Sequence, residues 1–318
     1  MKTGTPKTLQ EAIRYFSKPD NCQNFAAALR WPDGVKCPTC GSAKVGYLAQ
    51  QGRWQCSAKH PKRQFSVKVG TIFEDSPIGL DKWFTAMWML NNCKNGVSSG
   101  EIARDLGVTQ KTAWFMLHRI RLATQNRSFL KMAGEVEADE TFIGGLARNM
   151  HKDRRMEKIS GTGGAGSGKA IVMGLLDRHT RKVKIAHIQN VQADTLQPYV
   201  RKYVEGGSYV YSDAWVGYHG LDREYVHNVI DHAETYVQGN VHTNGIENFW
   251  SLLKRGPKGT YVSVEPFHLF RYLDEQAFRF NNRKVTDAER FTETLASVVG
   301  RRLTYKELTG KEETANVA

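Results

Sequence analysis

Residues 134–145 have the sequence GEVEADETFIGG, and the organisation of the second half of the chain follows from this stretch. Its polar and apolar side chains alternate, which is typical of a half-buried β-strand. Because alternate residues of a strand point to the same side, Glu137, Asp139 and Thr141 are expected to share one face. We therefore predict a strand over Glu135–Phe142 that directs acidic side chains to one side of a sheet.

The chain after this strand alternates between strand and helix patterns. The further strands expected are Ala170–Asp177, Val183–Gln189, Tyr209–Ser212 and one near Tyr225–Val229, and the helices expected are Thr195–Val204, Gly245–Lys254 and Phe267–Phe280. Three consecutive strands, followed by alternation with helices, favour an α+β or α/β fold around one sheet of mixed strand order.

Two more carboxylates stand at the ends of expected elements. In SYVYSDAW an apolar strand ends at Asp213, and in TNGIENFWSLLKR a helix carries Glu247. Asn244, Glu247 and Lys254 follow a spacing of i, i+3 and i+10, which places them on one face of that helix. The second half of the chain therefore offers three separated acids at positions that a folded sheet can bring together.

Two strand aspartates and a helical glutamate suit a two-metal site for phosphoryl transfer. Mg²⁺ (or Mn²⁺) prefers hard oxygen ligands and retains several waters, so Asp139, Asp213 and Glu247 could hold it together with a substrate phosphate. Two such ions about 3.5–4 Å apart stabilise the attacking and leaving oxygens of an in-line displacement. Lys254 is expected to lie over a DNA backbone. Any one of these acids alone would be interpreted as a solvated surface charge, but the combination favours the metal site.

Residues 98–121, SSGEIARDLGVTQKTAWFMLHRIR, fit a helix-turn-helix. Ser98 and Glu101 have the spacing of a capping box that opens a short helix. Gly107 can end this helix in a left-handed conformation, and Thr109 can cap the second one. Many three-helix cores share the pattern without binding DNA, but its place beside a cysteine cluster in a basic chain favours DNA recognition.

The second of these helices carries the candidate DNA contacts. Its first turns present Gln110, Lys111 and Thr112, which could reach base edges or phosphates in a major groove. Arg119 adds positive charge further along the same helix.

The cysteine cluster predicts a structural Zn²⁺ site. In Cys37-Pro-Thr-Cys40-Gly, two residues between the cysteines let both thiolates point at one ion. Cys56 supplies part of a second pair, and His60, four residues later, is the natural fourth ligand. The alternative is a set of free cysteines and a surface histidine, and the specific spacing of the first pair favours zinc.

The composition restricts the class of partner. The 318 residues include 45 Lys and Arg against 32 Asp and Glu, a formal net charge of +13, which makes a polyanion the first partner to consider. No stretch approaches the roughly 18 apolar residues needed to cross a bilayer. The first residues lack the apolar block of a signal peptide, so we expect a cytoplasmic, nucleoid-associated protein with no membrane contact.

A cysteine cluster, a helix-turn-helix and three spaced acids, in this order, resemble the DDE-type transposases of bacterial insertion sequences. The segments GTIFEDSPIGLDKWF, EADETFIGG, YSDAWVGY and HTNGIENFWSLLKRGPKGTY resemble one family of them in particular, over nearly the whole chain. The resemblance implies a ribonuclease H-like catalytic domain with Asp139, Asp213 and Glu247 as metal ligands and Lys254 at the basic position. Asn244, one turn earlier, is the alternative third residue, but a carboxylate neutralises metal charge better than an amide does.

The resemblance also implies an organisation and an activity. The expected segments are a helical region at 1–35, a zinc ribbon at 36–75, a helix-turn-helix domain at 76–130, a catalytic domain at 131–290 and a tail at 291–318. The expected activity is binding of terminal inverted repeats with Mg²⁺-dependent cleavage and transfer of DNA strands, by a homodimer or larger assembly. The alternatives are a DNA-binding regulator without strand transfer and a nuclease that cuts without joining.

Overall fold

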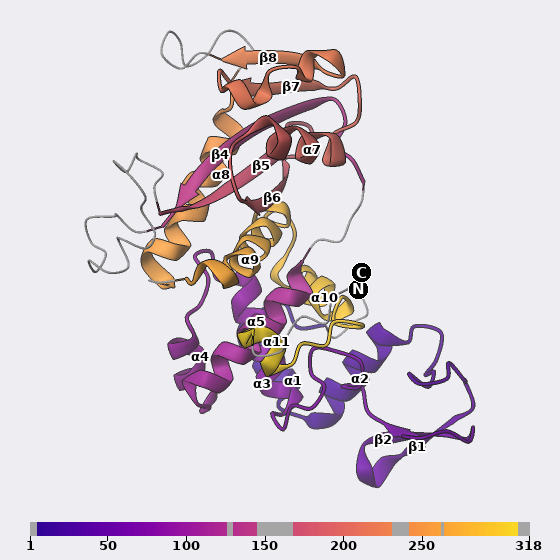
Figure 1. Cartoon of the computed structure of the whole chain (residues 1–318). Helices are drawn as coiled ribbons and strands as arrows, with labels where there is room; N and C mark the ends of the chain where they lie inside the picture. The colour runs from indigo at the N-terminus through magenta and orange to yellow at the C-terminus, as the bar shows by residue number, and fades with distance from the viewer. Residues whose placement is uncertain (1–4, 126–129, 145–167, 231–241, 262–263, 311–318) are drawn as a thin grey trace. The chain divides into compact units, whose positions relative to one another are not determined.

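The computed structural model describes residues 5–125, 130–144, 168–230, 242–261 and 264–310 (Figure 1). These residues form two compact units. The first contains the described residues up to Gln125 and those from Asn282 onward, and the second contains those between 126 and 281.

The first unit is mainly helical. Its helices are α1 (Leu9–Phe16), α2 (Pro19–Arg30), α3 (Leu80–Asn92), α4 (Ser99–Leu106), α5 (Gln110–Thr124), α10 (Asp287–Ala296) and α11 (Tyr305–Thr309). A small antiparallel sheet has the order β1-β2-β3, with strands β1 (Val45–Leu48), β2 (Arg53–Cys56) and β3 (Gln64–Phe65). The turn between β1 and β2 ends at Gly52, whose φ of 59° is in the left-handed region that favours glycine.

The helix pair α4 and α5 has the local structure expected of a helix-turn-helix. Ser98 and Glu101 form both hydrogen bonds of the capping box at the start of α4. Gly107 ends this helix with a φ of 59°. The Thr109 side chain then accepts a hydrogen bond from the backbone N–H of Thr112 at the start of α5. These cap predictions are confirmed.

Aromatic rings from both ends of the chain fill the core of the first unit. Phe16 of α1 contacts Phe84 of α3, with ring centroids 4.9 Å apart. Phe291 of α10 lies 5.7 Å from Phe84 and 5.3 Å from Trp88, and all four rings are buried. Aromatic side chains of this size contribute much of the buried apolar area of a core.

Described residues between 287 and 298 therefore belong to this core, whereas a tail was expected from residue 291 onward. Thr286 and Glu289 form a capping box that begins α10. The apolar positions Ala288, Phe291, Leu295 and Val298, which are part of the core, recur at helical spacing.

The second unit is built on a mixed sheet of order β6-β5-β4-β7-β8. The strands are β4 (Glu135–Ile143), β5 (Ala170–Asp177), β6 (Lys182–Ile188), β7 (Tyr209–Asp213) and β8 (Val226–Ile230). The pairs β4–β5 and β5–β6 are antiparallel, whereas β4–β7 and β7–β8 are parallel. The predicted mixed sheet is confirmed.

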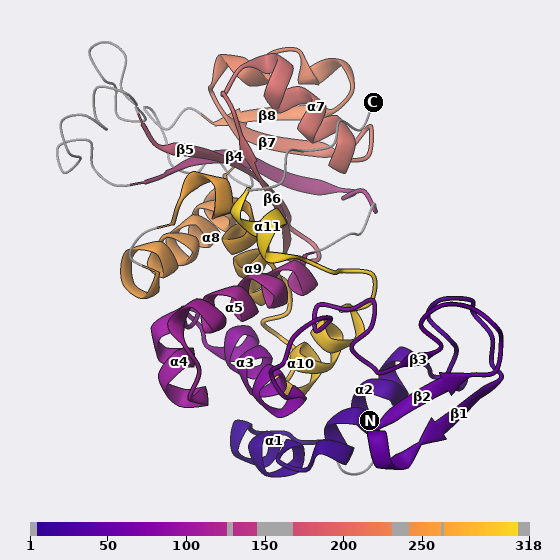
Figure 2. The same cartoon turned by 60° about the horizontal axis from the view of Figure 1, so that its bottom comes forward.

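Helices cover both faces of this sheet (Figure 2). They are α7 (Ala193–Tyr203), α8 (Asn244–Arg255) and α9 (Leu269–Asn281). Val136 and Ala138 of β4 lie in a core cluster with residues of α7. The opposite face packs against α8 and α9 in a second cluster. Successive residues of β4 therefore point to opposite faces of the sheet. Glu137 and Asp139 lie on the face that packs against α8.

We predict that Phe291→Ala destabilises the first unit by about 3–5 kcal/mol, because it leaves a cavity beside the rings of Phe16, Phe84 and Trp88. Denaturant unfolding followed by tryptophan fluorescence measures this change. Val299→Ala is the control, because 45 % of Val299 is exposed and its truncation is expected to change stability by less than about 0.5 kcal/mol. Equal stabilities of the two variants would contradict the role given to α10.

Candidate active site and zinc centre

Two of the predicted acids occupy neighbouring strand positions. The parallel strands β4 and β7 pair in register up to Glu137 and Tyr211. The next residues on the same faces, two positions further, are Asp139 and Asp213. β7 continues to pair with β8 as far as Asp213, although its pairing with β4 has ended. Asp139 and Asp213 therefore lie just beyond the last paired residues of β4 and β7.

The third acid lies on α8, and a buried carboxylate fixes the start of this helix. The backbone N–H of Ile246 donates a 2.8 Å hydrogen bond to Oε2 of Glu137, whose side chain is fully buried. Arg178 Nε donates a 2.9 Å bond to the other oxygen. A Cβ at Gly245 would lie 2.7 Å from Glu137 Oε2, so glycine is required for this close approach. Glu247, in the first turn, is consequently held at a set place relative to β4.

Helix α8 also contacts Asp139 directly. Trp250 Nε1 donates a 2.8 Å hydrogen bond to Asp139 Oδ2. The backbone N–H of Glu140 donates a 2.8 Å bond to Oδ1. Each carboxylate oxygen of Asp139 thus accepts one hydrogen bond and keeps a lone pair for a further ligand.

The electrostatics indicate that the three acids lie within range of one another. Burial is the largest cause that raises the pKa of Asp139 to about 6, and the negative charges of Asp213 and Glu247 act in the same direction. The hydrogen bonds from Trp250 and Glu140 oppose these effects. Carboxylates that repel one another in a partly buried place favour a bound cation.

A further acid, Glu140, lies next to this group on the opposite face of β4. Burial raises its pKa to about 8, and the charges of Asp139 and Asp213 add to the increase. The Tyr218 hydroxyl donates a hydrogen bond to Glu140 Oε1. Glu140 was not among the site residues predicted from the sequence, although it directly follows Asp139.

The remaining residues of the predicted site lie along α8. Asn244 is the exposed first residue of the helix, and Lys254 is half-buried in its last turn. Seven residues separate Glu247 from Lys254, which corresponds to about 10 Å along a helix axis. Lys254 therefore lies about two helical turns beyond Glu247.

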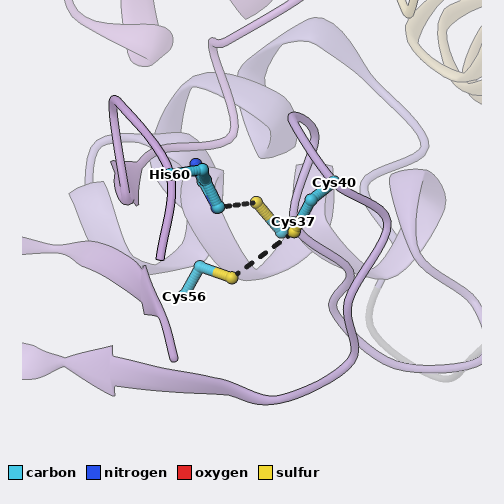
Figure 3. Close-up of side chains that lie close together, drawn as sticks. All are labelled: Cys37, Cys40, Cys56 and His60. Atoms are coloured by element: carbon cyan, nitrogen blue, oxygen red, sulfur yellow. Dashed lines mark hydrogen bonds between the residues drawn. The ribbon is translucent and has the colours of Figure 1, made fainter. Parts of the chain in front are cut away.

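The four predicted zinc ligands come together (Figure 3). Sγ of Cys37, Cys40 and Cys56 and a ring nitrogen of His60 all lie within 4.8 Å of one another. Cys40 Sγ is 3.7 Å from Cys56 Sγ, and Cys37 Sγ is 3.4 Å from His60 Nε2. A tetrahedral zinc ion with ordinary bond lengths requires about 3.8 Å between two sulfurs and about 3.6 Å between sulfur and nitrogen. The set therefore fits zinc.

The surroundings of two ligands favour the metal-binding protonation states. His60 Nδ1 lies 2.6 Å from the carbonyl oxygen of Pro61. Since that oxygen can only accept, Nδ1 carries the proton and Nε2 keeps its lone pair. Burial opposes ionisation of Cys37, but hydrogen bonds from the backbone N–H groups of Cys40 and Thr39 and from the Cys40 and Cys56 side chains together lower the pKa of Cys37 to about 6.

The candidate DNA contacts of α5 divide into two groups. Gln110 and Lys111 are exposed in the first turn and Thr112 is half-exposed, as their prediction requires. Arg119 is the exception and corrects the prediction, because it is only 4 % exposed. Its guanidinium donates 2.8 Å hydrogen bonds to the carbonyl oxygens of Leu303 and Ile72, so it joins parts of the core.

Comparisons with known proteins identify the family. A family model described as "ISXO2-like transposase domain" matches residues 131–281, and one described as "Transposase zinc-ribbon domain" matches residues 19–58. An "Uncharacterized transposase-like protein" of Haemophilus influenzae is 38% identical over 106 residues, which cover 33% of this chain and 85% of that protein. The chain belongs to the ISXO2-like transposases.

A second relative of this transposase is described as "Uncharacterized protein in transposable element ISH50" and comes from Halobacterium salinarum. It is 27% identical over 254 residues, which cover 76% of this chain and 84% of that protein. None of the helices in the described part of the transposase is long and apolar enough to cross a membrane.

We predict that the purified transposase carries one zinc ion per chain, measured by inductively coupled plasma mass spectrometry. Cys56→Ser removes one of four ligands and should cost the protein most of its zinc on dialysis, because tetrahedral sites need all four. Cys93→Ser, at a cysteine outside the cluster, should keep the full zinc content. Equal zinc contents in the two variants would contradict the assigned site.

Proposed function

We propose that this chain binds the terminal inverted repeats of an insertion sequence, cleaves DNA strands at those ends and transfers them to target DNA. The proposal is supported by the positions of the three acids: Asp139 and Asp213 follow the paired residues of the neighbouring strands β4 and β7, and Glu247 lies in the first turn of α8. Besides burial, the negative charges of Asp213 and Glu247 both act to raise the pKa of Asp139. The family supports a nucleotidyl-transfer reaction of this type.

The donor set fits divalent cations such as Mg²⁺ or Mn²⁺, because it offers carboxylate oxygens only. When bound, such cations lower the pKa of a nucleophilic hydroxyl or water and neutralise charge on the phosphate in the transition state. Asp139 and Asp213 would hold them from the sheet and Glu247 from the helix. We prefer Glu247 to Asn244, because the negative charge of Glu247 acts on Asp139.

Recognition of DNA is assigned to the first unit. The exposed start of α5 with Gln110 and Lys111 suits a major groove, since recognition helices use their N-terminal residues for base contacts. The net charge of +13 favours attraction to the phosphate backbone. Because two ends of an element must be held together for joining, we propose that the active species is a dimer or a larger assembly.

The acid cluster favours an enzyme over a regulator that only binds DNA. Burial and like charges make ionisation of Asp139 unfavourable, so the cluster lowers stability. A protein that only binds DNA has no use for a destabilising cluster of acids, whereas a catalytic centre needs such groups close together. A nuclease that cuts without joining is separated from a transposase by its products.

We predict that Asp139→Asn lowers strand cleavage and joining at least about 1,000-fold, because a metal ligand is lost from a site that acts mainly by electrostatic stabilisation. Gel assays with a duplex that carries the element's own ends measure both steps, and DNA binding should be unchanged. Asp194→Asn, at an exposed acid of α7, is the control with parental activity. Undiminished strand transfer by Asp139→Asn would exclude the proposed site.

We predict that Lys111→Ala weakens binding of the terminal repeat and reduces the slope of log affinity against log salt by about one, as expected for one lost phosphate contact. Fluorescence anisotropy over a series of salt concentrations measures this slope. Lys284→Ala removes the same charge at an exposed site outside α5 and should preserve the slope. The assignment of α5 fails if both variants bind like the parent protein.

A further inference from the structure

A buried tryptophan connects the helix of Glu247 to the strand of Asp139. Trp250 is 4 % exposed, yet its only polar atom, Nε1, is satisfied by Asp139 Oδ2 at 2.8 Å. The ring is otherwise part of the apolar cluster between α8, α9 and the sheet. The indole N–H is therefore directed at one atom of a candidate metal ligand.

The sheet is shaped to admit this ring. Gly174 of β5 is the cross-strand partner of Asp139. A Cβ at Gly174 would lie 2.5 Å from Cη2 and 2.7 Å from Cζ2 of Trp250, closer than non-bonded carbon atoms approach. The φ of Gly174 is not in the left-handed region. Glycine is therefore needed at this position because a side chain would not fit, and not because of the backbone conformation. The absence of a side chain there is what allows the indole to reach Asp139.

Two hydrogen bonds join α8 to β4, and the spacing of their donors along the helix matches the spacing of their acceptors along the strand. Ile246 and Trp250 are one turn apart on the helix, and four residues advance about 6 Å. Their partners Glu137 and Asp139 are two residues apart on the strand, which advances about 7 Å. Because both ends of this turn are bonded to the strand, the helix cannot slide along β4 without breaking one of the bonds. Glu247 lies on the turn between them.

We propose that Trp250 is a positioning residue of the metal site, and that Gly174 provides the slot that makes this possible. The indole N–H fixes the orientation of the Asp139 carboxylate and ties it to the helix that carries Glu247. Trp250 itself reaches neither metal nor substrate. The inference rests on the proposed function of the three acids. Partners of this kind, one step removed from a metal, typically change metal affinity or activity by about 10- to 100-fold.

The test compares Trp250→Phe with the parent protein in full-length, zinc-loaded form. Mn²⁺ binding is measured by electron paramagnetic resonance in the absence of DNA, so the readout does not depend on turnover. We expect Mn²⁺ affinity to fall about tenfold, and the Mn²⁺ concentration for half-maximal cleavage to rise by a similar factor. Saturating Mn²⁺ should restore most of the cleavage rate, because the ligands themselves are intact.

Phe249→Leu is the matched control. Phe249 is the neighbouring residue on α8, is equally buried and packs against Trp250 and Phe280, but it has no polar contact with Asp139. Its substitution also makes a buried side chain smaller, and we expect a similar decrease in melting temperature with unchanged Mn²⁺ affinity. If Trp250→Phe changes only the melting temperature, like Phe249→Leu, the positioning role is wrong.

Gly174→Ala tests the slot without changing a polar group. The added methyl displaces the indole, so Mn²⁺ affinity should fall about tenfold in the parent protein and less than about twofold in the Trp250→Phe background, a non-additive pair. Additive losses would overturn the proposed coupling. Asp139→Asn separates the two hypotheses: if it leaves Mn²⁺ binding unchanged, the proposed function fails, whereas a loss with Asp139→Asn but none with Trp250→Phe refutes only this inference.

Discussion

The elements that carry the three acids depend on one buried ion pair, between Glu137 and Arg178. Glu137 extends from β4 and accepts the backbone N–H of Ile246 at the start of α8. Arg178, directly after β5, donates to Glu137 and to the carbonyl oxygen of His242, and its guanidinium lies 3.8 Å from the ring centroid of Tyr211 on β7. A buried ion pair adds little net stability, because desolvation offsets the attraction. Its contribution here is geometric, since one pair joins β4, β7 and the N-terminus of α8.

This anchorage matters because the acids themselves oppose their own assembly. Burial raises the pKa values of both Asp139 and Glu140, and neighbouring carboxylates add to the increase. Sites that hold like charges together are destabilised locally, and the surrounding structure must compensate. The hydrogen bonds on Glu137 hold β4 and α8 in place on one side of the sheet, and the Tyr218 hydroxyl holds the Glu140 carboxylate on the other side. The cluster is thus imposed by the fold and not by attraction among its members.

Much of this arrangement could be predicted from the sequence because it depends on local patterns. Alternation along Glu135–Phe142 indicated which acids share a face, and the capping residues marked α4 and α5. Arg119 could not be judged in this way, because the groups that bury it come from residues 72 and 303, remote in sequence. The fit of Trp250 against Gly174 was equally hidden, since it depends on the register of β4 and β5 and on the placement of α8 over both. Local patterns predict elements, whereas the contacts that tune a site are tertiary.

The zinc site and the proposed catalytic metal site also differ in how far the sequence alone could predict them. The zinc ligands lie between residues 37 and 60, where the spacing of one knuckle fixes two of them, and nitrogen and sulfur fill all four tetrahedral positions. Such a closed site can stabilise a small ribbon but leaves no position for a substrate. The acids come from residues 139, 213 and 247, offer oxygen only and include an exposed Glu247, so part of the ligand shell of a bound cation would be left to water and phosphate. A site of this open kind needs a rigid framework to hold its few ligands, and contacts behind the acids, such as the hydrogen bonds of Glu137 and Trp250, join the strand and the helix that carry them.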